Sequence, residues 1–326
     1  MTTSDYKHKL LQIIETARFA PSVHNAQPWE VALDVTTPGL TISITTKRPL
    51  TQSDATGRET FISLGIFAEA CICAALEQGL GLKNLTVDEA GKKIGITFTE
   101  TTSDTGQEKF ADILRQRFTD RSVFKPVTLA DETLKKIEKS WKSDNSTIVC
   151  STDKAIIEQV ATLTMKGQQL AFTSDAFRHE LADYIVPTNK SAVGIPTTAL
   201  QVGPLKRRFS KITVARGWFK NIEMSLEYKK WVSASGLVFV LSEGDRTPQW
   251  VDAGRAYLHA SIAIQTLGLN QSTSAAVVEA SDFHEDIEKL LGTQKRILSI
   301  IRIGTGVGFD KKHHSGRLTT EDIIVT

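Results

Sequence analysis

Residues 20–29 read APSVHNAQPW, and this loop is the most informative stretch of the chain. It packs two prolines, Ser22, Asn25, Gln27 and a tryptophan together, directly after a segment with helical apolar spacing over 10–20. Its hydroxyl and amide groups can match the mixed hydrogen-bond donors and acceptors of a planar heterocycle. Any single serine or asparagine here would also serve an ordinary capped turn, so the loop alone indicates a small-molecule site without identifying the molecule.

A second polar segment, residues 117–124, reads RFTDRSVF. The alternation of Arg117, Thr119 and Arg121 puts two guanidinium forks and a hydroxyl where a phosphate could sit. Taken alone, a solvated charge cluster at a helix end explains these residues better. The phosphate interpretation therefore depends on the two segments together.

Composition places the chain among ordinary globular proteins. Its 326 residues are 40% hydrophobic and 23% charged, which excludes a collagen, a disordered tail protein and a disulfide scaffold. The formal net charge of +2 predicts no global attraction to nucleic acid or to anionic membranes. Three cysteines cannot all pair, and the plain expectation is a reducing cytoplasm without disulfides.

The spacing of apolar residues predicts a chain of helices and strands. The stretch 61–82 is long enough to span a bilayer, but it contains Glu69 and Glu77, so a buried helix in a soluble core or at a subunit seam is the better interpretation. The N-terminus lacks the apolar region and cleavage site of a secretory signal, and we expect a cytoplasmic protein. Helices are expected over 10–20, 61–78, 110–118, 130–141, 154–172 and 254–267, and strands over 31–34, 40–45, 85–88, 94–99, 147–150, 237–241 and 297–303.

Two larger features concern the organisation of the chain. Residues 173–222 break any clean period, and we interpret them as a functional lid or arm. The segment AALEQGLGLKNLTV (74–87) matches SIAIQTLGLNQSTS (261–274) in shape, with an apolar helix, a Gly-Leu exit and a strand. The lag is far longer than that of a solenoid repeat, so the match suggests two related halves. The polar stretch 101–109 is the best linker.

Other candidate motifs carry less weight. Gly304-Thr305-Gly306-Val307-Gly308 follows a strand, but the residues after it do not begin a helix, as a dinucleotide-binding loop requires. His313 and His314 have no carboxylate or cysteine at ligand spacing, so no metal site is predicted. The basic arm at 206–220 could contact nucleic acid, but a solvated face or an anion-steering rim explains it better.

Together, the two polar segments resemble those of one family. APSVHNAQPW resembles the A-P-S-x-x-N-x-Q-P-W segment of the FMN-dependent nitroreductases. RFTDRSVF resembles their phosphate-binding R-x-S-x-[RK]-x-F segment, with threonine for serine and one extra residue before phenylalanine. The C-terminal KKHHSGRL (311–318) resembles the basic segment that closes the same phosphate site.

The order of these segments is unusual, because the loop opens the chain and the phosphate segment follows about a hundred residues later. This order resembles the tandem-domain, Acg-type branch of the family, in which two degenerate copies fuse into a pseudo-dimer. Residues 54–65 and 177–204 also resemble that branch, the latter as its lid. The resemblance implies an α+β fold of two tandem nitroreductase-like halves, 1–105 and 106–326, with the lid at 173–222.

The resemblance further implies one FMN site per chain, built from both halves. In ordinary members of the family, one protomer supplies the residues that bind the phosphate, here called the phosphate grip. The other protomer supplies the A-P-S-x-x-N-x-Q-P-W loop. A second loop of this type does not recur in the C-terminal half, and no basic grip occurs in the first half. The implied site residues are Ser22, Asn25 and Gln27 for the ring and ribityl side, Arg117, Thr119, Arg121, Lys312 and Arg317 for the phosphate, and Ser274 and Ala275, within Ser272–Ala275, for the flavin N5.

The implied activity is an oxidoreductase in which hydride from NAD(P)H passes through the flavin to a nitro, quinone or similar small-molecule acceptor. No side chain is assigned as catalytic. One alternative is a flavin-binding storage, sequestration or stress protein whose closed lid blocks turnover, and another is a nucleic-acid-binding module. Nucleic acid and membrane are not expected as partners, and a fused pseudo-dimer is expected to be a monomer or a weak homodimer.

Overall fold

The N-terminal half is an antiparallel sheet covered by helices. Its elements are α1 (Thr3–Ala17), β1 (Trp29–Asp34), β2 (Gly39–Ile44), α2 (Arg58–Glu77), β3 (Leu80–Asp88) and β4 (Lys93–Glu100). The four strands lie in the order β1-β2-β4-β3, with α2 as the connection between β2 and β3. Helix α1 begins at a capping box formed by Thr2 and Asp5, and it buries Leu10, Ile13 and Ile14. The structure is a computed structural model that describes residues 2–102, 110–200, 204–217, 220–306 and 314–325.

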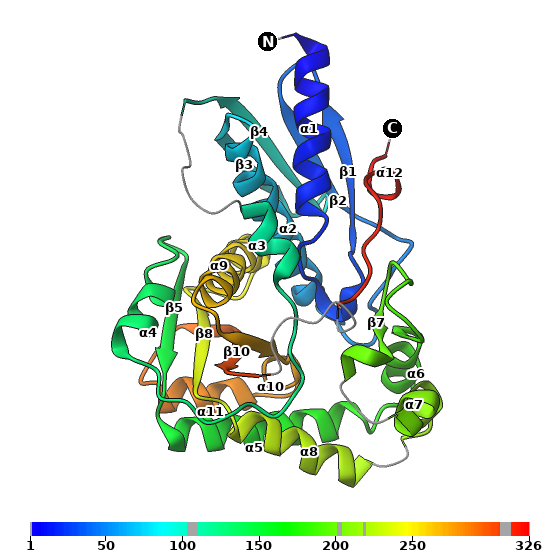
Figure 1. Ribbon diagram of the computed structural model, residues 1–326, viewed down its shortest axis with the longest axis vertical. Helices are drawn as coiled ribbons and strands as arrows, with labels where there is room; N and C mark the ends of the chain where they lie inside the picture. Colours follow the sequence, from blue (N-terminus) through cyan, green and yellow to red (C-terminus); the bar gives the residue numbers. More distant parts are fainter. Residues whose placement is uncertain (1, 103–109, 201–203, 218–219, 307–313, 326) are drawn as a thin grey trace.

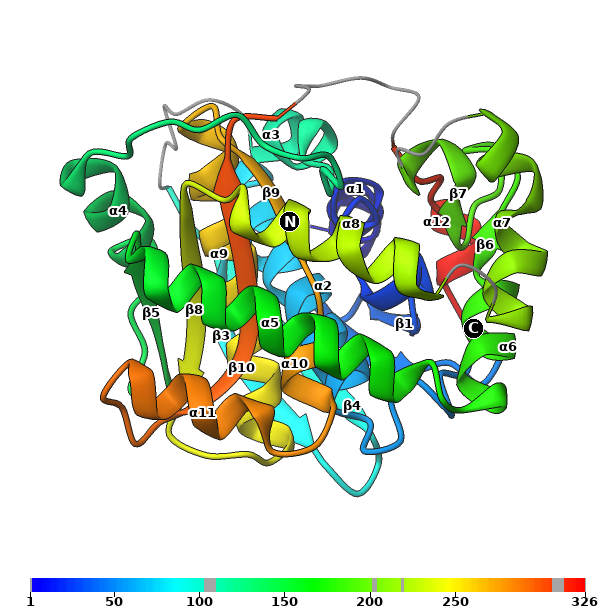
Figure 2. The same ribbon diagram turned by 90° about the horizontal axis from the view of Figure 1, so that it is seen from below.

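The C-terminal half contains a second antiparallel sheet of four strands, in the order β5-β8-β10-β9. Helices α5 and α8 run across one face of this sheet, as Figure 2 shows, and α11 packs beside them. Its main elements are α3 (Phe110–Gln116), α4 (Asp131–Glu138), β5 (Ser146–Ser151), α5 (Lys154–Ala171), α8 (Lys220–Val232), β8 (Gly236–Ser242), α9 (Thr247–Thr266), β9 (Asn270–Thr273), α10 (Ala276–Glu279), α11 (Phe283–Leu290) and β10 (Arg296–Gly304).

The two halves share one connectivity. In each half, two neighbouring strands are followed by a 20-residue helix and then by two more strands. The fourth strand in the chain lies next to the second, and the third strand lies at the edge of the sheet. Adding 189 to the bounds of α2, 58–77, gives the bounds of α9, 247–266. Both helices end in a glycine of positive φ, Gly79 and Gly268, which are also 189 residues apart. The predicted two-half α+β arrangement is therefore confirmed, although the structural lag is two residues longer than the lag of 187 at which the sequence segments match.

The two long helices α2 and α9 cross at the centre of the molecule, between the sheets (Figure 1). A Cβ atom added at Gly65 would lie 2.1 Å from the carbonyl oxygen of Val251. A Cβ atom added at Gly254 would lie 2.1 Å from the carbonyl oxygen of Ile62, three residues before Gly65. Only glycine allows this close backbone approach on both sides, and the two contacts are related by the internal repeat.

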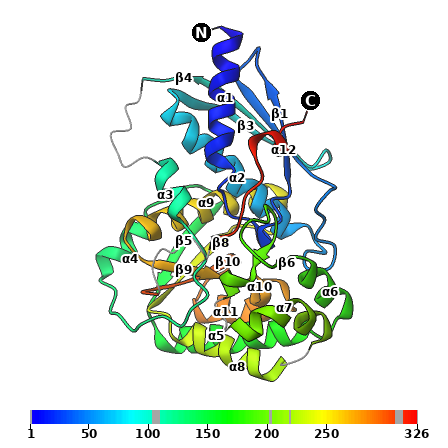
Figure 3. The same ribbon diagram turned by 45° about the vertical axis from the view of Figure 1, so that its right-hand side comes forward.

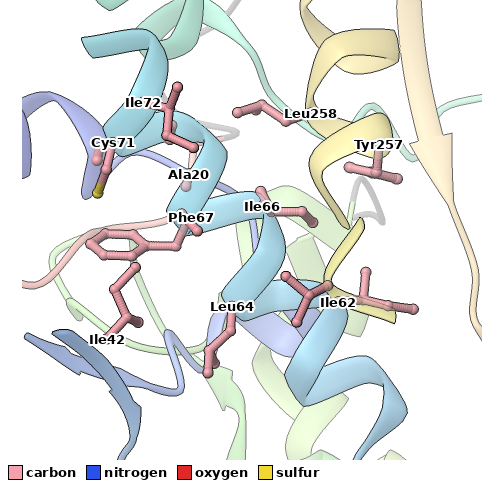
Figure 4. Packing of buried hydrophobic residues seen from close by; sticks show 14 of the residues in the cluster. Ala20, Ile42, Ile62, Leu64, Ile66, Phe67, Cys71, Ile72, Tyr257 and Leu258 are labelled. Carbon is pink, nitrogen blue, oxygen red and sulfur yellow. The ribbon is translucent and has the colours of Figure 1, made fainter. Parts of the chain in front are cut away.

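Helix α2 is nearly all buried because its faces pack against different partners. In Figure 4, Phe67 points toward Ile42 of β2, whereas Ile62 and Ile66 lie on the side of α9. Among the described residues, α2 is the one helix long and apolar enough to cross a membrane, but 83% of its most apolar window is buried inside the protein. This burial agrees with the expectation of a buried helix.

The chain crosses between the halves twice after their sheets are complete. After β4, the segment 117–125 lies on the second sheet, where the Asp120 N–H donates to the Gln271 carbonyl over 2.8 Å. After β10, the chain returns to the first sheet, where the Val325 N–H donates to the Val31 carbonyl over 2.9 Å, next to α12 (Thr320–Ile323). The halves are thus interlocked. The predicted boundary after residue 105 lies outside the described residues and stays a prediction.

The segment 173–222 is more regular than its sequence indicates. It contains α6 (Asp175–Asp183), β6 (Ile185–Val186), β7 (Ile195–Pro196), the 3-10 helix η2 (Thr197–Leu200), α7 (Pro204–Arg216) and the start of α8. The prediction of an irregular excursion was wrong, because short, half-exposed helices bury too few residues to give a clear apolar period. Helices α6 and α7 pack on each other, on the side of the molecule opposite to α4 (Figures 1 and 3).

Candidate functional site

Six of the predicted site residues line one pocket where the two halves meet. Loop 20–29 forms one wall, segment 117–121 forms the second, and residues 314–317 of the C-terminal segment form the third. Ile195 of the lid closes the remaining side. The predicted residues in the lining are Ser22, Asn25, Arg117, Thr119, Arg121 and Arg317.

Three guanidinium groups converge on this pocket with little to neutralise them. Burial lowers the pKa of Arg117, which is 5% exposed, and lowers the pKa of Arg317 to about 9. Burial also lowers the pKa of Arg121, with Glu227 acting against it. Neither Arg117 nor Arg317 makes an ion pair with any residue in the described ranges, and Arg117 Nε and Nη1 and Arg317 Nε have no hydrogen-bond partner there. Buried cations with unused donors form a site for an anion.

The loop over residues 22–27 is strained. His24, Asn25 and Gln27 have φ values of 48°, 55° and 49°, in the left-handed region that side chains disfavour. Among the contacts that hold this shape, Ser22 Oγ accepts the Gln27 N–H over 2.9 Å and Ser63 Oγ of α2 accepts the Val23 N–H over 3.2 Å. Such a cluster of strained residues is typical of a functional site.

Asn25 and Gln27 use their amide groups to tie the loop to the lid and the C-terminal segment. Asn25 Nδ2 donates to the carbonyls of Gly194 and Gly316 over 3.1 and 3.0 Å, and its Oδ1 is buried without a partner. Gln27 Nε2 donates to the Ala192 carbonyl over 2.8 Å, and its Oε1 accepts the Leu318 N–H over 2.9 Å. Gln27 is fully buried and does not line the pocket, so the structure gives it a tethering role.

The lid is closed over this pocket. Glu180 of α6 accepts hydrogen bonds from the Gln52 and Ser53 N–H groups over 2.9 and 2.8 Å. It also accepts one from the Thr51 hydroxyl and one from the Ser53 hydroxyl. Burial opposes ionisation of Glu180, but these hydrogen bonds lower its pKa overall. The Tyr184 hydroxyl donates to the Pro49 carbonyl over 3.1 Å.

The closed lid leaves a cavity of about 60 Å³ in the arginine pocket. A group of the size of a phosphate fits this space, whereas a whole ligand of nucleotide size needs several hundred Å³. Between the lid and residues 47–52 lies an open cleft of about 600 Å³, bordered by Arg48, Glu180, Tyr184 and Gly194. Val193 and Gly194 border the cleft and Ile195 lines the pocket, so the same loop borders both spaces.

The remaining predicted residues lie elsewhere. Ser274 and Ala275 precede α10 and do not line the pocket, and the Ser274 hydroxyl accepts the Ala276 N–H over 3.3 Å. Lys312 and His313 lie outside the described residues. His314 does line the pocket, beside Phe118 with 5.4 Å between the ring centres. In the basic arm, Lys211 forms an ion pair with Asp183 over 3.1 Å on the exterior of the lid.

Two residues near the pocket were not anticipated. His24 lines the pocket, and its ring centre lies 5.9 Å from that of Tyr184 on the lid. Arg302 of β10 is 1% exposed and hydrogen-bonds to the main chain of segment 120–122. His24 stands inside the motif, so its position was a usable signal, but an arginine inside an apolar strand gives no indication of the loop that it contacts.

No sequence profile of a protein family matches this chain. The probable NAD(P)H nitroreductase PigM of Serratia sp. (strain ATCC 39006) is 39% identical over 69 residues, which are 21% of this chain and 19% of that protein. The chain thus matches about a fifth of the length of this curated relative. It is similar in sequence to a nitroreductase over that part.

Solved structures of flavoproteins also align with the chain. A nitroreductase with bound FMN from Desulfitobacterium hafniense DCB-2 covers 68% of this chain and 98% of its own, with 14% identity and a TM-score of 0.42. A BluB-like flavoprotein from Clostridium difficile 630 covers 66% and 97%, with 16% identity and a TM-score of 0.41. The FMN-dependent nitroreductase NfnB from Mycobacterium smegmatis, in complex with NADPH, covers 60% and 86%, with 13% identity and a TM-score of 0.39. The repeated sheet topology defines the fold of this chain.

Proposed function

We propose that this chain, which is similar to the FMN-dependent nitroreductases, is a flavin oxidoreductase that holds one FMN at the junction of its two halves. One observation carries the proposal: three guanidinium groups converge on a cavity of phosphate size, with buried N–H donors that have no partner among the described residues. The resemblance of the two polar segments to the FMN-binding segments of that family names the anion as the phosphate of FMN.

The residues of the pocket fit a phosphate group. Arg117 and Arg317 would donate the N–H groups that now lack partners, and Arg121 and the Thr119 hydroxyl would complete the grip. A dianion among these side chains would offset the cost of burying their charge. Lys312 stays a further proposed contact.

The loop 22–27 is the proposed wall for the ring and ribityl chain. Ser22 and Asn25 line the pocket beside the arginines, and Asn25 Oδ1 is a buried acceptor with no partner among the described residues. Ser274 and Ala275 stay proposed as the main-chain contact of the ring. When bound, flavin supplies hydride transfer between NAD(P)H and a nitro, quinone or similar acceptor.

The chain's own contribution is to position the group and to control access. The lid excludes water while it is held by Glu180, Asn25 and Gln27, and its opening would admit NAD(P)H and then the acceptor. A lid that does not open would instead make the protein a flavin store, and the test below separates these functions.

The test is an absorbance spectrum after FMN addition and desalting, followed by anaerobic NADH or NADPH on the same sample. Retained flavin that bleaches supports the oxidoreductase, and retained flavin that stays yellow supports the flavin-holding function. A protein that retains no flavin would contradict both.

Replacing one arginine of the grip gives a sharper prediction. Arg117→Met should weaken FMN binding about ten- to hundredfold, because charge-assisted hydrogen bonds are lost. The same substitution should stabilise the FMN-free protein by about 1–3 kcal/mol, because an uncompensated buried charge is removed.

Arg115→Met is the matched control, since Arg115 lies two residues away on α3 with 43% of its side chain exposed. Titration of FMN and urea unfolding measure the two effects. Unchanged FMN affinity in Arg117→Met would remove Arg117 from the site.

A further inference from the structure

Arg302 is a buried arginine that lies outside the pocket and contacts its main chain. From β10, its Nη2 donates to the carbonyl oxygens of Asp120 and Ser122, each over 2.9 Å. Its Nη1 donates to the Lys230 carbonyl over 3.1 Å, and its guanidinium lies 4.0 Å from the ring centre of Phe124. Three of these four contacts are with the phosphate segment 117–124.

Burying this cation is costly, and the contacts indicate what offsets the cost. Burial lowers the pKa of Arg302 to about 10, and Glu227 and Asp120 act against that shift. The group therefore stays charged at neutral pH. A charged guanidinium fork can hold two carbonyl oxygens from one nitrogen, which a shorter or neutral side chain at this strand position cannot do.

The two carbonyls that Arg302 holds flank Arg121 on either side. The Asp120 oxygen lies in the peptide plane before Arg121 and the Ser122 oxygen lies in the plane after Ser122, so Arg302 fixes one peptide unit on each side of the Arg121–Ser122 pair, since each peptide unit is planar. The same loop is anchored by the Asp120 N–H on Gln271 and by the Ser122 N–H, which donates to Asp120 Oδ1 over 2.9 Å. Arg302 is the cationic member of this anchor and holds the main chain on both sides of Arg121.

We propose that Arg302 is a positioning residue for the phosphate grip, which holds the loop at 120–122 so that Arg121 faces the pocket. The inference rests on the proposed FMN function. Replacing Arg302 should weaken binding of the phosphate and leave binding of the flavin ring largely unchanged. The reason is that Arg302 does not line the pocket but contacts the loop that carries Arg121. FMN and riboflavin share the ring and differ by that phosphate, so their affinities separate positioning from general damage.

The experiment measures the dissociation constants of FMN and riboflavin by flavin fluorescence for the wild type, Arg302→Met, Arg302→Lys and Arg255→Met. Arg255→Met is the matched control, because Arg255 is also largely buried, at 20% side-chain exposure, but binds Glu69 on α2 instead. Arg302→Met should weaken FMN about tenfold or more and riboflavin less than about threefold. Arg302→Lys, which keeps the charge and therefore protects folding, should give an intermediate ratio, and Arg255→Met should leave the ratio unchanged.

Hydrogen exchange of the FMN-free protein provides a readout that does not depend on flavin. Amides of segment 117–124 should exchange about tenfold faster in both Arg302 variants, while amides of α2 keep the wild-type rate. An unchanged FMN-to-riboflavin ratio together with unchanged exchange in 117–124 would overturn the proposal. Wild-type protein that binds neither flavin would overturn the proposed function, while faster exchange would still identify Arg302 as the anchor of the loop.

Discussion

His24 shows how a single residue couples the pocket to pH. Burial, with a smaller contribution from Arg121, lowers its pKa to about 4, although Glu180 on the lid acts in the opposite direction. The imidazole is therefore neutral at pH 7 in the folded protein. Below a pH of about 6.5 the unfolded chain binds a proton that the folded chain does not bind, so stability should fall as the pH decreases toward 4.

We predict that His24→Asn removes this part of the acid sensitivity. Asparagine also tolerates the positive φ of 48° at this position, and it carries no titrating group. Between pH 7 and 4 the wild type should lose up to about 3 kcal/mol more of its free energy of unfolding than the variant. Urea unfolding at several pH values measures this difference, and parallel curves for the two proteins would contradict it.

For single residues, the sequence predicted which side chains belong to the site but did not predict the structural role of each one. The motif positions of Ser22, Asn25 and Arg117 predicted one site, and these residues do meet in one pocket. The tethering role of Gln27 could not be predicted, because it depends on the Ala192 carbonyl and the Leu318 N–H, which the fold brings from 165 and 291 residues away.

At the scale of elements, the contact between α6 and the loop at 51–53 holds the lid closed. We predict that Glu180→Ala releases it, because one carboxylate then no longer accepts four hydrogen bonds. Trypsin should cleave after the exposed Lys190 about tenfold faster under native conditions. Asp183→Ala on the same helix is the control, since it removes only an exposed ion pair. Equal cleavage rates in the two variants would show that Glu180 does not hold the lid.

The elements differ in how well the sequence predicted them. The long apolar helix α2 and the strands β8 and β10 were expected close to their observed bounds, because burial on several sides gives continuous apolar runs. Helices α6, α7 and α11 were not predicted. Each buries few residues against the rest of the protein, so tertiary contacts rather than periodicity decide their conformation.

At the scale of the whole molecule, the crossing of α2 and α9 holds the halves together. Gly65→Ala and Gly254→Ala should each destabilise the protein by about 3 kcal/mol or more, because the new Cβ would overlap a main-chain oxygen of the other helix. Gly81→Ala, whose nearest contact would be 3.5 Å, should change stability by less than about 0.5 kcal/mol. Urea unfolding tests this, and a loss below about 1 kcal/mol at the crossing would show that the helices can separate.

The internal repeat also locates the counterpart of the proposed site. Ser63, which holds loop 20–29, corresponds to Asp252, and Asp252 Oδ2 accepts the Ser143 hydroxyl over 2.8 Å. Around this counterpart, Trp141 packs against Arg255, with 5.0 Å between the guanidinium and the ring centre. Glu69 binds Arg255 and His259 over 2.7 and 2.8 Å. The side chains of this region bind one another rather than leaving unpaired buried cations, which supports the proposal of one flavin per chain.

The 189-residue repeat has a consequence for how this protein can change over generations. In a symmetric homodimer every substitution appears in both sites, so a change that alters one site alters the other in the same way. Here a substitution in loop 20–29 alters one place only, and its counterpart before β5 is free to acquire different residues. Two similar halves in one polypeptide are free of the constraint of symmetry, so one half can specialise in rigidity while the other keeps the strained loop that lines the pocket.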